Sequence, residues 1–188
     1  MKKILSLVLA LVMLLCTAAA FAEAPDSPEK IETVTTDNEN VSFVPVDEEE
    51  MNEAFKDNAD KVNDAVADAA SKGDVKSLVA EEAKDIIPDG FNTMLGTGTV
   101  YSVSEVPEDV KSLTVTISFP TTYQENEKVV LLVAILDADG NAVEFFAVEG
   151  KANADGDVVV TFDEATLNKI GGKKIKVFPF SEDGIVRN

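Results

Sequence analysis

Residues 129–136 read Val-Val-Leu-Leu-Val-Ala-Ile-Leu, an apolar run without a single polar side chain. A short run of this kind, rich in β-branched residues, is typical of a strand that is covered on both faces. We therefore expect a sheet with this strand at its centre. The helical segment that precedes it in the chain is the candidate cover for its outer face.

Further strands are expected on both sides of this run. Residues 113–119 alternate between apolar and hydroxyl side chains, which predicts a strand with one buried face. Two turns contain Asp-Gly, at 137–141 and 153–157, and each precedes a strand, at 142–149 and 158–162. The remaining signals are a strand within 94–103, a short helical connection capped by Asp163, the pair Gly171-Gly172, and a last strand with Ile175 and Val177 on one face and Lys174 and Lys176 on the other.

Six strands at this spacing indicate an antiparallel β-sandwich over residues 91–188. The order, with its short helical crossover before the last strand, resembles the immunoglobulin-like and fibronectin III-like modules of bacterial surface proteins. The resemblance covers roughly residues 91–180 and concerns architecture only, so it assigns no functional residues. The Cys, Trp, Cys signature of true immunoglobulin domains is absent from the sequence.

The preceding segment, residues 47–90, has the period of a helix and predicts a helical hairpin, so that the chain is α+β by content. Asp47 is the expected N-cap of the first helix, Gly73 lies where it ends, and Asp74 and Pro88 bound the second. The first helix is amphipathic. Its acidic stripe is interpreted as a solvated face, with a docking face for a basic partner as the alternative, and comprises Glu53, Asp57, Asp60, Asp64 and Asp68.

The N-terminus predicts export. Residues 1–22 combine two lysines, an apolar core and a small-residue end, which is the order of a secretory signal peptide, with cleavage between Ala22 and Glu23. The apolar core is short for a membrane-spanning helix, and Leu15 before Cys16 disfavours a lipoprotein signal. The brevity of the signal resembles bacterial export signals. Residues 23–46 are then expected to form a flexible acidic leader with one short strand near 41–46.

Composition excludes several classes of function. The full chain has a formal net charge of −19, and loss of Lys2 and Lys3 with the signal leaves −21, so nucleic acid and anionic lipid are disfavoured partners. The chain has no histidine, and its only cysteine lies within the signal. The mature protein therefore lacks the residues of a Ser-His-Asp or Cys-His nucleophile and of a typical zinc site.

The two Asp-Gly turns contain the only candidate metal ligands, which are Asp137, Asp139, Asn141, Asp155 and Asp157. The first turn begins like a calcium loop, but Gly140 stands at the fourth position rather than the sixth, and Val148 stands where the loop requires glutamate. Turn formation is sufficient reason for both sequences. Apart from calcium at these turns, no cofactor is expected.

The sequence therefore predicts a secreted, non-catalytic binding module for an extracellular protein or glycan, at the cell surface or free of it. Its candidate contacts are the loops 123–128, 137–141 and 153–157. One alternative is a small carboxylate-dependent hydrolase of polysaccharide or cell wall, which requires a cleft with a carboxyl of raised pKa. The other is a calcium-stabilised surface protein. The absence of Trp and the presence of only two Tyr disfavour stacking on sugars.

Overall fold

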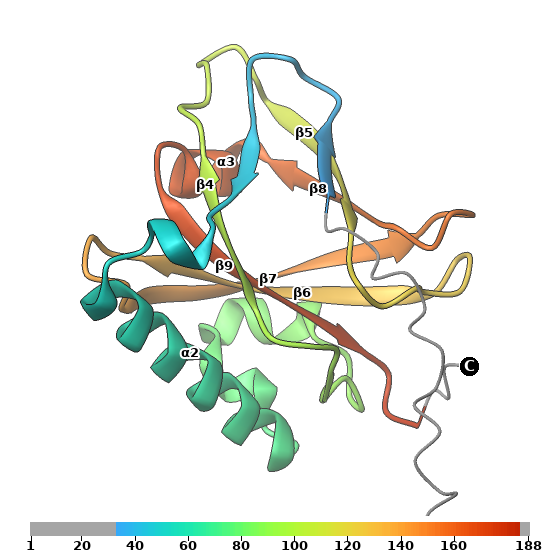
Figure 1. Cartoon of the computed structure of the whole chain (residues 1–188). Coiled ribbons are helices and arrows are strands. Elements are labelled where there is room, and N and C mark those ends of the chain that lie inside the picture. The colour runs from blue at the N-terminus through green and yellow to red at the C-terminus, as the bar shows by residue number, and fades with distance from the viewer. Residues whose placement is uncertain (1–32, 185–188) are drawn as a thin grey trace, which may run out of the picture.

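In the computed structural model, residues 33–184 are described, and they form one curved antiparallel sheet (Figure 1). The helix at 53–71 lies on its convex side, and the short helix at 164–170 is packed into the core on its concave side. The strand order is β1-β5-β8-β7-β6-β9-β4-β2, and the short β3 adds to β9. The strands are β1 (Thr33–Thr36), β2 (Phe43–Pro45), β3 (Thr93–Met94), β4 (Thr99–Val103), β5 (Ser112–Ser118), β6 (Lys128–Leu136), β7 (Ala142–Ala152), β8 (Val158–Asp163) and β9 (Lys174–Ser181).

The sheet is nearly closed on itself. Its first and last strands, β1 and β2, are neighbours in the sequence and are joined by residues 37–42. Paired hydrogen bonds hold both ends of this loop. Asp37 accepts from Thr114 N–H at 3.0 Å and donates its own N–H to Thr114 O at 3.1 Å, and Ser42 N–H donates to Ser104 Oγ while Ser104 N–H donates to Ser42 O, each at 3.0 Å. The β-rich fold is confirmed, but the two packed sheets of an immunoglobulin-like sandwich are not what the described residues form.

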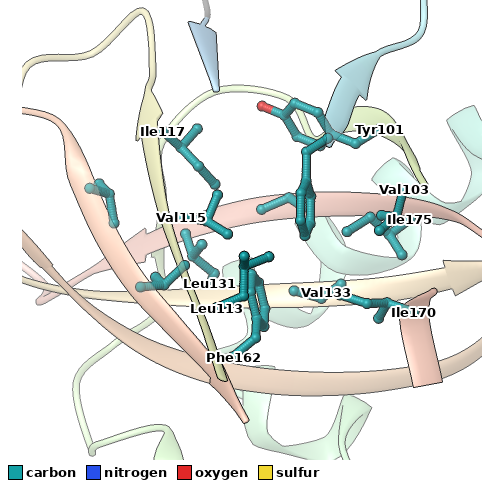
Figure 2. Close-up of a cluster of buried hydrophobic side chains, with 14 of the residues drawn as sticks. Tyr101, Val103, Leu113, Val115, Ile117, Leu131, Val133, Phe162, Ile170 and Ile175 are labelled. Atoms are coloured by element: carbon teal, nitrogen blue, oxygen red, sulfur yellow. The ribbon is translucent and has the colours of Figure 1, made fainter. Parts of the chain in front are cut away.

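An apolar core fills the concave side of this sheet. Figure 2 shows side chains from β4, β5, β6, β8, β9 and α3 (Glu164–Ile170) converging there. Phe43 of β2 stacks on Phe162 of β8, with ring centroids 5.7 Å apart, and so ties the edge strand to the interior. The alternating strands supply one residue in two to this core, as their sequence pattern predicts.

A second core lies between the convex side of the sheet and the helices. The long helix α2 (Glu53–Ser71) presents Phe55, Val62 and Val66 to it, and the sheet presents Val130, Leu132, Phe178 and Phe180. The central strand β6 is therefore buried on both faces, with alternate residues in the two cores. This confirms the expectation that helices cover its outer face.

The predicted hairpin of two helices is wrong in its second half. Residues 74–90 form two short 3₁₀ segments, η2 (Val75–Leu78) and η3 (Glu81–Ile86), separated by extended backbone at Val79. Val75, Val79 and Ile87 are all buried against the sheet, so the chain follows the sheet surface instead of completing regular turns. Gly73 ends α2 as predicted, with φ of 68°.

The start of α2 also differs from the prediction. Asp47 precedes only a single 3₁₀ turn, η1 (Glu48–Glu50), and makes no side-chain capping bond. The N-cap of α2 is Asn52, whose Oδ1 accepts a hydrogen bond from Phe55 N–H at 2.9 Å. Asp163 caps α3 as predicted, because its Oδ1 accepts from Thr166 N–H at 2.8 Å.

The predicted leader is partly structural. Within 33–46, β1 pairs with β5 and β2 pairs with β4, where the sequence predicts only one short strand. Residues 23–32 and the predicted signal peptide, including Ala22 and Glu23, lie outside the described residues. Among residues 33–184, none of the helices combines the length and apolar character that crossing a membrane requires.

Candidate functional site

A pocket of about 270 Å³ opens where α2 meets the sheet. One wall is the side of α2 that carries Lys56, Ala59, Asp60 and Asn63, the opposite wall is the segment 97–100 at the start of β4, and η1 closes one side. We call it the Lys176 pocket after the cation that lines it. Its lining combines two lysines, two acids, an amide and two hydroxyls with apolar side chains: Val46, Glu48, Met51, Lys56, Ala59, Asp60, Asn63, Thr97, Gly98, Thr99, Val100 and Lys176.

Lys176 is the unusual member of this set. It lies on β9, paired with Ala134 of β6, and its alternation places it on the convex face beneath α2. It is only 3 % exposed, which is rare for lysine because an ammonium group loses its hydration on burial. Burial accordingly lowers the pKa of Lys176, and the carboxylates of Asp60 and Glu48 oppose this shift.

The ammonium group keeps donor capacity for a ligand. Its Nζ donates one hydrogen bond, to the carbonyl oxygen of Ala59 at 2.8 Å, and lies 6.0 Å from the centre of the Phe178 ring. A lysine has three N–H donors. Asp60 acts on the pKa of Lys176 through space and not through a direct ion pair, since no described carboxylate lies within 4.0 Å of this Nζ.

The rim of the pocket is set by a second lysine. Lys56, on the first turn of α2, forms an ion pair with Glu48 of η1, and both side chains remain partly solvated. The hydrogen bond from Lys56 holds the pKa of Glu48 below its usual range. Glu48 is therefore a fixed carboxylate at neutral pH, and Asp60 on the exposed side of the same helix is the other acid of the pocket.

Gly98 allows the far wall to lie close to the sheet. A Cβ at this position would stand 2.4 Å from the Phe178 ring, inside any normal contact distance. The backbone N–H of Gly98 donates to Asn63 Oδ1 of α2 at 3.2 Å. The glycine thus brings strand β4 and helix α2 together across the pocket, with Phe178 beneath.

The first candidate calcium turn, 137–141, is stabilised by hydrogen bonds of its own. Asp137 Oδ1 accepts from the backbone N–H groups of Asp139 and Asn141, each at 2.9 Å, and these bonds lower the pKa of Asp137. The turn also packs on the start of α2, where Asn58 Nδ2 donates to Asp139 O at 3.0 Å. The carboxylate of Asp137 and the main-chain carbonyl of Asp139 are therefore engaged within the protein.

The second turn, 153–157, is built in the same way. Asn153 Oδ1 accepts from the N–H groups of Asp155 and Asp157, both at 2.9 Å, and Ser118 Oγ donates to Asp157 at 2.7 Å. The two turns lie at opposite ends of β7, so the structure does not bring their carboxylates together. Over residues 33–184, no three metal-ligating side chains form a group able to hold an ion.

The predicted contact loops do not form one surface. Loops 123–128 and 153–157 are adjacent, since Tyr123 N–H donates to Gly156 O at 3.3 Å. Loop 137–141 lies at the other end of β6. The predicted acidic stripe on α2 is exposed along its whole length, and only Asp60 of its members lines the pocket.

Sequence reasoning places Lys176 on the face opposite Ile175 and Val177 but does not single it out. Two of the expectations, taken together, would have identified Lys176 as a buried residue. If helices cover the outer face of β6, then a lysine on the same face of a neighbouring strand must also be covered.

Comparison with known proteins identifies no relative. No protein-family model matches the chain, and neither the curated proteins nor the solved structures contain a significant match. The site must therefore be interpreted from its own chemistry.

Proposed function

We propose that this chain is an exported, non-catalytic binding protein and that the Lys176 pocket is its ligand site. The observation that carries the proposal is the buried ammonium group at the wall of an open pocket. A buried charge lowers the stability of the folded protein unless it is paired and hydrogen-bonded, and such groups are concentrated at functional sites. A bound anionic oxygen would accept the hydrogen bonds that Lys176 can still donate.

The size and charges of the pocket limit the kinds of ligand that it can bind. Its volume of about 270 Å³ is at the small end for ligand sites, so a drug-sized or oligomeric ligand does not fit inside. Glu48 and Lys56 neutralise each other at the rim. Lys176 and Asp60 remain as a separated cation and anion, which is the arrangement that a zwitterion of amino-acid size would bridge with its carboxylate and its ammonium group.

The hydrolase alternative has less support at this site. Such an enzyme requires a general acid with a raised pKa, whereas the pKa of Glu48 is shifted downward. The sequence also offers no histidine as another base. Export itself rests on the signal-like N-terminus, and the intact mass of the secreted protein tests it, because cleavage before Glu23 fixes that mass.

The ligand proposal is tested by thermal unfolding and calorimetry with three sets of compounds: amino acids, monosaccharides and small hydroxycarboxylates. A ligand at about 100 times its Kd should stabilise the folded protein by about 2.7 kcal/mol. We expect an amino acid to bind and the Lys176→Met variant to bind it at least about tenfold more weakly, a loss typical of a charged hydrogen bond.

Lys84→Met is the matched control, since Lys84 pairs with Glu81 on η3 and does not line the pocket. It should bind like the unmodified protein. Failure of all three sets to bind, or equal affinity in the Lys176→Met variant, would contradict the proposal.

A further inference from the structure

Strands β7 and β8 separate soon after they meet. Their ladder covers only Gly150 to Ala152, paired with Val160 to Val158. Beyond Gly150, β7 continues to Ala142 alongside β6, while β8 continues alongside β5 to Asp163 and passes into α3. A single ion pair from α3 spans the gap, between Lys169 and Glu144 at 2.6 Å. Inside an otherwise continuous sheet, one side of β7 is thus left without a neighbouring strand.

The hydrogen-bond pattern shows which backbone groups face this gap. Ala152 O accepts from Asn126 N–H, and Ala152 N–H donates to Glu127 O, each at 2.9 Å, so the groups of Ala152 point along the β6 side. Backbone groups alternate in direction along a strand. Those of Phe145, Ala147 and Glu149 therefore point away from β6, toward the gap. The N–H and C=O groups of Phe145 and Ala147, and the N–H of Glu149, therefore face no neighbouring strand, and such groups can pair with an added strand.

A groove of about 530 Å³ lies beside the part of this row of backbone groups formed by Ala147 and Glu149. Ala147 and Val148 form its floor, Thr161 and Thr166 form the β8 and α3 side, and η3 forms the opposite wall. Ile86 of η3 is 37 % exposed there, one of few large apolar side chains so exposed in the described chain. We call this site, lined by 85–86, 147–149, 161, 163 and 166, the edge groove.

The charged side chains of the edge groove are all acidic: Asp85, Glu149 and Asp163. Glu149 is partly neutralised by Lys128 at 2.8 Å, and Asp163, which caps α3, has a lowered pKa because Thr166 donates hydrogen bonds to it. Asp85 forms none of the ion pairs of the described residues. The groove therefore favours a positively charged occupant, in keeping with the net charge of −19 of the whole chain.

We propose that the edge groove binds an extended, basic peptide segment of a partner protein, which adds to β7 as a new strand. The main-chain N–H and C=O groups of Phe145 and Ala147 and the N–H of Glu149 supply the hydrogen bonds, and alternate side chains of the peptide meet the acids at the rim. This site is separate from the Lys176 pocket, with which it shares no lining residue, and the two proposals stand or fall independently.

The test uses the mature chain and the labelled peptide (Lys-Thr)4, with (Glu-Thr)4 as the charge control. Fluorescence anisotropy measures binding, and amide hydrogen exchange locates it. We expect (Lys-Thr)4 to bind and to slow exchange at Phe145, Ala147 and Glu149, and (Glu-Thr)4 not to bind. Two further peptides carry N-methyl groups on all lysines or on all threonines. Only one set of amides faces β7, so one of these should lose binding and the other should keep it.

The Asp85→Asn/Glu149→Gln variant should bind (Lys-Thr)4 about fivefold more weakly, as expected for solvated charge pairs. Asp57→Asn/Asp64→Asn, on the exposed face of α2, is the matched control and should leave the affinity unchanged. The proposal is overturned if (Lys-Thr)4 does not bind, if the three amides are not protected, or if both N-methylated peptides bind alike. Binding by Lys176→Met with unchanged affinity would separate this site from the pocket.

Discussion

Lys176 is a charged side chain in apolar surroundings. It shares the convex core with Phe178 and Phe180, where every other covered position on the sheet is apolar. Its contact with Ala59 anchors the middle of α2 to β9. The same residue thus has a structural role and, in our proposal, a ligand-binding one. The pH dependence of stability measures the cost of its buried charge in the absence of ligand.

The lowered pKa of Lys176 predicts a specific pH dependence. Between its folded-state pKa and the ordinary value of 10.5, the unfolded chain holds the proton that the folded chain has released. The free energy of unfolding therefore gains a positive slope with pH in that window, and the full cost of the buried charge applies below it. The Lys176→Met variant lacks this slope.

Urea unfolding of both proteins at neutral pH and near pH 10 measures the effect as a difference, which cancels the other lysines. The stability of the unmodified protein relative to Lys176→Met should rise with pH. An unchanged or falling difference would show that the ammonium group is not desolvated in the folded state.

At the scale of elements, the N-cap of α2 can be tested by substitution. Asn52→Ala should lower the free energy of unfolding by about 1 kcal/mol, because it removes the bond to Phe55 N–H. Asp47→Ala should change it by less than about 0.5 kcal/mol, because Asp47 makes no capping bond. Chemical unfolding of the two variants distinguishes the structure from the sequence prediction, which expects the larger loss at Asp47.

The elements that could be predicted are those with a sustained period. The strands β5, β6, β8 and β9 alternate or are mostly apolar, β7 follows a recognisable Asp-Gly turn, and α2 repeats its apolar residues every three or four positions. Short elements carry too few residues for a period to show, and β1 and β3 were missed for this reason. In 74–90, burial of apolar residues against the sheet outweighs local helix formation.

At the scale of the whole molecule, the sequence pattern could not distinguish one nearly closed sheet from two packed sheets. In both, every strand has one face in a shared core, so the alternation of side chains is the same. The difference depends on β1 and β2, which have only four and three residues. The candidate pocket could not be predicted from the sequence for a related reason, since it exists only where α2, β4 and β9 meet.

The turns at 137–141 and 153–157 predict the response of the whole protein to calcium. The side-chain oxygens of Asp137 and Asn153 already accept backbone hydrogen bonds, and the two turns lie at opposite ends of β7, so we expect the same melting temperature in millimolar calcium and in chelator. A site with Kd a hundredfold below the calcium concentration would add about 2.7 kcal/mol of stability. A rise of several degrees in calcium, lost in Asp155→Asn or Asp137→Asn, would instead favour the calcium-stabilised alternative.

The near closure of the sheet has a consequence for the proposed export of the chain. Thr33 pairs with Ser118 and Phe43 with Val103, so the first strands of the described chain find their partners only after some sixty to eighty-five more residues are present. Such distant pairings form slowly. A polypeptide threaded N-terminus first through a narrow export channel would emerge with its leading strands still open and would complete its fold only on the far side.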